Sequence, residues 1–200
     1  MQTIDRIADL EALYDAPVPT SLTKVVRQMT PLYRQWIGAA RFVVLSTVGP
    51  EGTDGTPRGD DGPVVRIVDD TTLWLPDWRG NNRIDSLRNI LRDGRVSLMF
   101  MVPGSTNVVR VNGRAVLTAD SAVTGNFEQK GQNPKTVIVV TLDEMYFQCA
   151  KAILRSGLWA RGDDSAAVPT AGQFLKEQDR GFDGDNYDAR YPEQAKSRMW

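Results

Sequence analysis

The fold is decided by residues 73–90, which read LWLPDWRGNNRIDSLRNI. Apolar residues favour a short strand over 73–75, and Pro76 and Gly80 predict a tight turn after it. Apolar residues at helical spacing then predict a helix over about 82–92. Its predicted apolar face consists of Ile84, Leu87, Ile90 and Leu91.

The start of this helix is a physically competent phosphate site. Asn81 or Asn82 can cap the helix, because an asparagine side-chain oxygen accepts a hydrogen bond from a free backbone N–H. Arg83 adds a positive charge where the free N–H groups already favour an anion. The structural alternative is a strand, a capped helix and arginines that face water. The stretch alone leaves both interpretations open.

Composition excludes several classes of function. The 200-residue chain fits one domain, has 41% hydrophobic residues and carries a formal charge of −1, so no global field attracts nucleic acid or membrane. The absence of histidine excludes histidine zinc sites, Ser-His-Asp triads and histidine-ligated haem. We predict no metal site.

Cysteine content and hydropathy predict a cytoplasmic location. Cys149 is the single cysteine, so no internal disulfide forms, and we expect it to be a buried, unreactive thiol. The sequence contains no run of about 18 apolar residues, so it predicts no membrane span. The N-terminus is acidic and has no apolar signal core.

The order of predicted elements indicates a mainly β protein with flanking helices. Strands are expected over 41–48, 56–68 with a glycine-rich bulge, 72–75, 95–102, 108–118 with a bend at Gly113, and 137–147. Short connections between them favour a six-stranded antiparallel barrel over a doubly wound sheet. We predict a helical segment packed on the barrel over 1–40, a barrel over 41–160, and a polar extension over 161–200, helical at 173–178 and otherwise a docked or loose tail.

Five motifs in order resemble the pyridoxamine 5'-phosphate oxidase-like family, the FMN-binding split barrels, and within it a branch of FMN-dependent enzymes without a settled substrate. The motifs are TPRGD at 56–60, LPD at 75–77, GNNRIDSL at 80–87, RVNGRA at 110–115, and CAKA with RSGLW over 149–159. The resemblance covers roughly residues 10–160. It implies a split barrel that forms a homodimer, with FMN at the subunit interface.

The resemblance also implies which residues bind FMN. Asn81, Asn82 and Arg83 would hold the phosphate, with Arg58 beside Gly59 and also Arg66 reaching from the preceding strand. Charge-assisted, bidentate donors suit a phosphate dianion. The edge of the flavin ring would lie along backbone groups near Val65 and near Pro76 and Asp77.

A second set of residues would come from the partner chain, by the same resemblance. Lys151 and Arg155 are four residues apart and share a helical face, and Trp159 follows them. Structural alternatives remain for each: a solvated helical lysine, or a tryptophan that anchors the dimer without touching flavin. Arg58 has the alternative of a surface ion pair with Asp60 or Asp61.

Two departures argue against vitamin B6 oxidation. The chain lacks the histidine that the true oxidases carry near the C-terminus, and its tail GFDGDNY at 181–187 is acidic, which would repel a substrate phosphate. We therefore expect an FMN-dependent oxidoreductase that acts on an unknown small molecule. A flavin-binding module without turnover is the alternative, and a deazaflavin in place of FMN is a third reading.

The catalytic residues remain unknown from sequence. Asp77 is the nearest candidate for an acid or base, but capping or orienting Arg79 or Arg83 is an equally physical role for its carboxylate.

Overall fold

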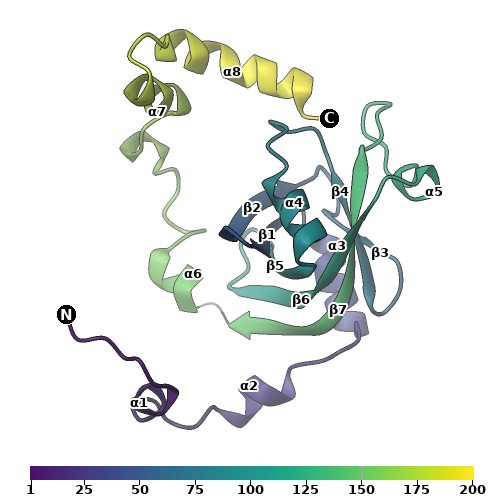
Figure 1. Ribbon diagram of the computed structural model, residues 1–200, viewed down its shortest axis with the longest axis vertical. Coiled ribbons are helices and arrows are strands. Elements are labelled where there is room, and N and C mark those ends of the chain that lie inside the picture. The colour runs from purple at the N-terminus through teal and green to yellow at the C-terminus, as the bar shows by residue number, and fades with distance from the viewer. Residues whose placement is uncertain (150) are drawn as a thin grey trace.

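The computed structural model describes residues 1–149 and 151–200, and its centre is one curved antiparallel sheet with helices around it (Figure 1). The strand order is β2-β1-β5-β6-β7-β4-β3. The strands are β1 (Phe42–Gly49), β2 (Gly52–Gly59), β3 (Arg66–Ile67), β4 (Thr72–Asp77), β5 (Arg95–Met101), β6 (Asn107–Thr118) and β7 (Thr136–Cys149). The predicted mainly β architecture with flanking helices is confirmed.

The predicted count of six strands is wrong, because the described chain has seven. The expected single strand over 56–68 is divided into β2 and the two-residue β3, which lie at opposite edges of the sheet. β2 pairs with β1 over its whole length, although its sequence GTDGTPRG has no large apolar side chain. Pairing with the apolar β1 therefore defines β2, and hydrophobic periodicity could not reveal its first half, residues 52–55.

The core lies inside the curve of the sheet. Val43, Leu45, Leu98, Phe100 and Ile138 are fully buried. Burial alternates along β1 and along β5, as expected for strands with one face towards a core. The residues between the buried ones point to the other face of the sheet, where most of them are only partly buried.

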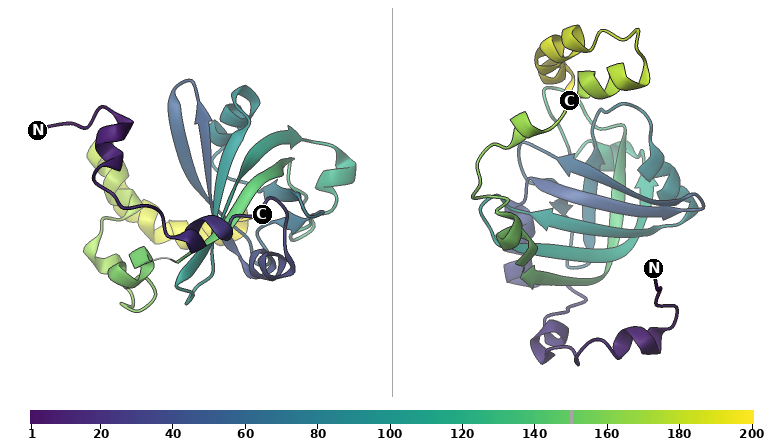
Figure 2. Two further views of the ribbon diagram at one scale, coloured as in Figure 1. Left: turned by 90° about the horizontal axis from the view of Figure 1, so that it is seen from below. Right: turned by 90° about the vertical axis from the view of Figure 1, so that its left-hand side faces the viewer.

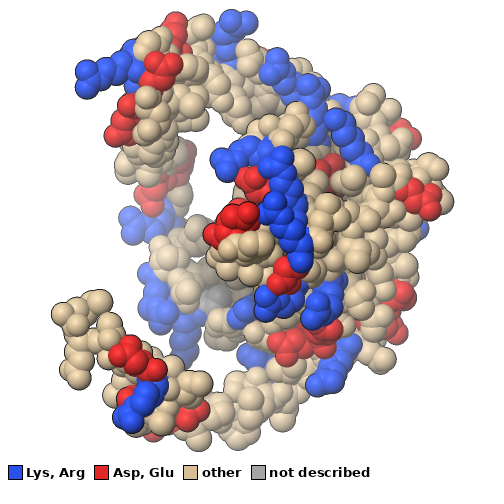
Figure 3. Space-filling view, in the orientation of Figure 1, with Lys and Arg blue, Asp and Glu red and all other residues tan. Residues whose placement is uncertain are grey.

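The helix α4 (Asp85–Arg92) covers one side of the barrel, where Figure 3 shows a run of basic side chains. Leu87 and Ile90 face the core as predicted, but Ile84 and Leu91 are exposed. The predicted asparagine cap is wrong: Ile84 is the N-cap, in the left-handed conformation at φ 53°, and no side chain caps it. The turn before the helix uses a second left-handed residue, Asn82 at φ 61°, which moves the helix start towards Asp85.

Two polar contacts, one buried and one partly buried, fasten α4 to the first hairpin. Asn89 donates to Thr47 Oγ1 over 3.2 Å, and Ser86 donates to the Asp54 carboxylate over 2.6 Å. Because unpaired buried polar groups are costly, these bonds fix the register of the helix on β1 and β2. The turn that precedes α4 is fixed with it.

The N-terminal helices are α1 (Ile7–Glu11), α2 (Pro19–Thr23) and α3 (Pro31–Ala39). The last of these packs on the core through Ile37, whereas α1 and α2 bury none of their residues. The division into segments 1–40, 41–160 and 161–200 stays a prediction. No helix among residues 1–149 and 151–200 has the length and apolar character needed to cross a membrane.

The helix α5 (Ser121–Thr124) lies between β6 and β7. After β7 come α6 (Lys151–Ser156), a 3-10 turn (Ser165–Ala167), α7 (Ala171–Gln178) and α8 (Gly184–Arg198). The helices α7 and α8 lie at the opposite end of the barrel from α1 and α2 (Figure 2). The long helix α8 was missed because it is strongly polar and contains Pro192. The predicted helical segment 173–178 forms most of α7, while Ala150 of the CAKA motif lies outside the described residues.

Strands β6 and β7 carry the predicted irregularity. Their register shifts between Asn112 and Gly113, which confirms the bend expected at Gly113. Beyond the core, β7 extends to Cys149, which is exposed, so the prediction of a buried thiol is wrong. The apolar run before Cys149 suggested burial, but the last residues of β7 project past the part of the sheet that the core covers.

Replacing Gly113 with alanine is expected to destabilise the barrel by about 3 kcal/mol, because over-packing a rigid site costs energy. A Cβ at this position would overlap the carbonyl oxygen of Thr141, a backbone atom. Gly38→Ala in α3 is the control, since a Cβ there meets nothing within 4 Å. Urea unfolding of both variants checks the prediction; equal midpoints would contradict it.

Candidate functional site

A large cavity lies where the two ends of the sheet face each other. Its volume is about 760 Å³, and Thr56–Gly59 of β2 form one wall while Leu75 and Pro76 of β4 form another. Because β2 and β4 belong to opposite ends of the strand order, the cavity occupies the gap that hydrogen bonding leaves open. A neighbouring cavity of about 690 Å³ shares Arg58 and Trp78–Asn81 with the first.

An ion pair between Arg58 and Asp77 bridges this gap. Arg58 in β2 donates to the carboxylate of Asp77 at the end of β4, and the two side chains are 21% and 18% exposed. This finding replaces the alternatives of Arg58 paired with Asp60 or Asp61, and of Asp77 paired with Arg79 or Arg83. Asp77 therefore joins the end of β4 to β2 through Arg58, and an acid or base role for it stays untested.

Arg58 also carries an unused donor. Its Nε is buried and has no hydrogen-bond partner among the described residues. Buried donors are almost always paired, so an unpaired guanidinium N–H in a cavity wall is suited to a ligand oxygen. The planar guanidinium can donate to an anion while it keeps its bond to Asp77.

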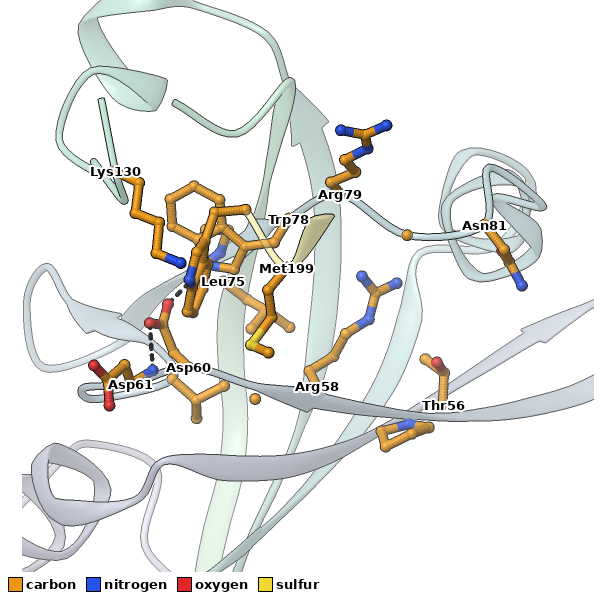
Figure 4. A pocket seen from close by; sticks show the side chains of 16 residues that line it. Thr56, Arg58, Asp60, Asp61, Leu75, Trp78, Arg79, Asn81, Lys130 and Met199 are labelled. Atoms are coloured by element: carbon orange, nitrogen blue, oxygen red, sulfur yellow. Dashed lines mark hydrogen bonds between the residues drawn. The ribbon is translucent and has the colours of Figure 1, made fainter. Parts of the chain in front are cut away.

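Asp60 fixes the opposite wall (Figure 4). It accepts hydrogen bonds from the Trp78 indole N–H at 2.7 Å, the Gln129 amide at 2.9 Å and the Asp61 backbone N–H at 2.7 Å. The three bonds join the end of β2, the turn after β4 and the loop before β7. They hold the ring of Trp78 as a fixed aromatic wall.

The turn 79–84 closes one end of the site. Asn81 Oδ1 accepts from the Arg83 backbone N–H over 3.0 Å, and Arg83 pairs with Asp85 at 2.8 Å. A smaller cavity of about 280 Å³ lies against this turn, and Arg58, Asn81 and Arg83 are among its lining residues. The turn thus carries two donors of the predicted phosphate set into one small space.

The predicted site residues fall into two groups. One group surrounds the adjoining cavities: Arg58, Gly59, Pro76, Asp77, Asn81, Asn82 and Arg83. The other lies apart from them. Val65 is buried in the core, and Arg66 is exposed on β3. Neither is among the described residues that line the two larger cavities, and their cofactor roles stay predictions.

The residues predicted to come from a partner lie on α6 and just after it. Lys151 and Arg155 are exposed, and Trp159 donates its indole N–H to the Ser105 carbonyl over 2.8 Å. They are separated along the chain and in space from the cavities that Arg58 lines. Their role depends on a second copy of the chain and stays a prediction.

Sequence reasoning missed several wall residues. They are Trp78, Arg79, Lys130, Lys135, Met199 and Trp200. Trp78 and Arg79 lie within residues 73–90, where a large aromatic side chain beside turn residues was the available signal. Met199 and Trp200 carried no signal, because a polar segment separates them from every motif.

Among the described residues, no group of three or more acidic, cysteine or histidine side chains is arranged to hold a metal ion.

The antiparallel sheet curves into a barrel that stays split between its two edges, and the cavity lies at this split. Residues 29–149 match the sequence model of the family described as Pyridoxamine 5'-phosphate oxidase, which is more than half of the chain. The chain therefore belongs to this family. A search of curated proteins gave no match.

Solved structures share the fold at low identity. HupZ of Group A Streptococcus is 19% identical, with 61% of this chain and 95% of that chain covered, at a TM-score of 0.50. General Stress Protein 26 from Bacillus anthracis is 19% identical (56% and 88% covered, TM-score 0.43). An FMN-binding protein from Syntrophomonas wolfei is 15% identical (57% and 86%, TM-score 0.41). The fold assignment relies on the first of these and on the family match.

Removing the Asp60 carboxylate is expected to loosen the aromatic wall. Asp60→Ala leaves the Trp78 and Gln129 donors without their partner, and we expect a loss of about 2 kcal/mol in the free energy of unfolding. The control is Asp61→Ala, whose side chain is 85% exposed. Denaturant unfolding measures both, and a loss in Asp61→Ala as large as in Asp60→Ala would contradict the assignment.

Proposed function

We propose that this protein binds FMN non-covalently in the cavities between β2 and β4 and carries out redox chemistry on a small organic molecule. The observation that carries the proposal is that Arg58 lines a large cavity and that its buried Nε has no hydrogen-bond partner among the described residues. Family membership and the split-barrel fold support it independently.

The residues present fit the chemistry of FMN. A phosphate dianion needs charged donors, and Arg58, Asn81 and Arg83 line part of one small cavity next to the main one. Two carboxylates also line it: Asp54 accepts from Ser86, and Asp85 pairs with Arg83. Arg79, Lys130 and Lys135 add positive charge around the larger cavities. A volume of about 760 Å³ lies within the range of ordinary cofactor sites.

In the proposed site, FMN and the protein's side chains have separate roles. When bound, FMN supplies the electron transfer; the protein's residues bind, orient and shield. Arg58 and the turn 79–83 would hold the phosphate. Trp78 and Leu75 would cover the ring and keep water away. Since Asp77 is held by Arg58, we assign no side chain as acid or base.

A homodimer completes the proposed site. In that arrangement Lys151, Arg155 and Trp159 of the partner subunit reach the flavin. Exposed apolar side chains support an interface on this part of the chain: Leu154 is 61% and Leu158 is 49% exposed. Apolar residues gathered on one surface commonly mark a protein contact.

Vitamin B6 oxidation is not part of the proposal, because the chain lacks histidine and its tail is acidic. A cytoplasmic location remains a proposal based on the single cysteine. The second candidate function is a flavin-binding module without turnover, and the observation that favours it is Asp77, whose carboxylate is committed to Arg58.

Titration with FMN tests the proposal directly. The purified protein is expected to retain or bind FMN, with a changed visible spectrum, and to exist as a dimer in sedimentation experiments. A protein that neither retains nor titrates FMN would overturn the proposal. Competition with a deazaflavin identifies the preferred ring, and anaerobic reduction by nicotinamide cofactors followed by oxidants separates an enzyme from a binding module.

Arg58→Gln is expected to weaken FMN binding by about 2–3 kcal/mol, because a charged donor to the phosphate is lost. Arg83→Ala is expected to weaken it by about 2 kcal/mol for the same reason. Arg34→Gln is the matched control, because this arginine is exposed and pairs with Asp70 on another surface. Isothermal titration with FMN measures all three, and wild-type affinity in both test variants would place the phosphate elsewhere.

A further inference from the structure

The last two residues of the chain form part of the wall of the proposed flavin site. Met199 and Trp200 both line the main cavity, and Trp200 also lines the neighbouring one. The Trp200 ring meets the Trp78 ring edge to face, with centroids 5.4 Å apart and planes at 86°. Figure 4 shows the Met199 side chain between Trp78 and Arg58.

The helices before Trp200 direct it to this place. Thr170 and Gln173 form a capping box at the start of α7. Asp188 on α8 accepts from the Gly172 backbone N–H over 2.8 Å, and also from the Thr170 hydroxyl. A Cβ on Gly172 or Gly184 would overlap the backbone of the other residue, so the two helices meet in close contact. The direction of α8 is thereby fixed relative to α7.

The contact of Trp200 is with a residue that is itself fixed. Asp60 holds the Trp78 indole at 2.7 Å, so Trp200 packs on a rigid aromatic surface. Edge-to-face aromatic pairs are favourable beyond the area that they bury. Trp200 is half-buried and leaves a volume of about 760 Å³ open, so it forms a wall of the cavity and does not fill it.

We propose that Trp200 is a ligand-contacting residue, which packs its indole against the ring system of the bound flavin and determines affinity for the ring. The inference rests on the proposed function. Its physical basis is that a planar, apolar ring system is best bound between aromatic and thioether groups, which Trp78, Trp200 and Met199 provide. The C-terminal helices would then serve to bring this residue back to the barrel.

The test separates contact with the ring from contact with the phosphate. Full-length wild type, Trp200→Ala, Trp200→Phe and Arg58→Gln are titrated with FMN and with riboflavin, which lacks the phosphate. Trp200→Ala is expected to weaken both ligands about tenfold and by the same factor. Trp200→Phe is expected to recover most of this loss, whereas Arg58→Gln is expected to weaken FMN more than riboflavin.

Tyr191→Ala is the matched control. It removes an exposed aromatic ring from α8, and Tyr191 is not among the described residues that line either cavity. Its affinity for both ligands is expected to equal that of the wild type, and circular dichroism checks that every variant is folded.

Each outcome has one meaning. Wild-type protein that does not bind FMN overturns the proposed function and this inference with it. Wild-type protein that binds FMN, together with unchanged affinities in Trp200→Ala, overturns this inference alone. A loss for FMN without a loss for riboflavin in Trp200→Ala also overturns it, because the contact would then be with the phosphate.

Discussion

The ion pair between Arg58 and Asp77 joins two strands that the sheet itself does not join. β2 and β4 lie near opposite ends of the strand order, and backbone hydrogen bonds end before the barrel closes. The two half-buried side chains bridge this gap. Loss of one partner would leave a poorly solvated charge, which is costly, so the pair constrains both edges together. Both cavities are lined by Arg58, and the second is also lined by Asp77.

Asp60 provides the second constraint on the same gap. Its carboxylate gathers donors from three separate parts of the chain and so orients Trp78. Trp78 in turn contacts Trp200, which links the end of the chain to the barrel. The cavity is thus enclosed by an ion pair on one side and an aromatic pair on the other. One side suits an anion, and the other suits a flat ring.

This division matches the two ends of a flavin nucleotide. Family membership and the barrel establish the class of protein, and the Arg58 Nε, which has no partner among the described residues, is a donor suited to an anionic group. The substrate is a separate matter, since no side chain in the walls is assigned an acid or base role.

Local pattern by itself determined the apolar strands, the bend at Gly113 and the region around 73–90 that holds the site, because hydrophobic periodicity and glycine geometry act over short distances. It placed only residues 56–59 of β2 in a strand, because the side chains of β2 are polar and its pairing comes from β1. It also missed the left-handed Ile84 that starts α4.

The contacts that shape the site were decided by the tertiary structure alone. Arg58 and Asp77 are 19 residues apart, Asp60 and Gln129 are 69 apart, and Trp200 meets Trp78 only after α7 and α8 turn the chain back. Such pairs depend on where strands end in space. No local rule of spacing or propensity encodes that position, so the sequence could name the donors but not their partners.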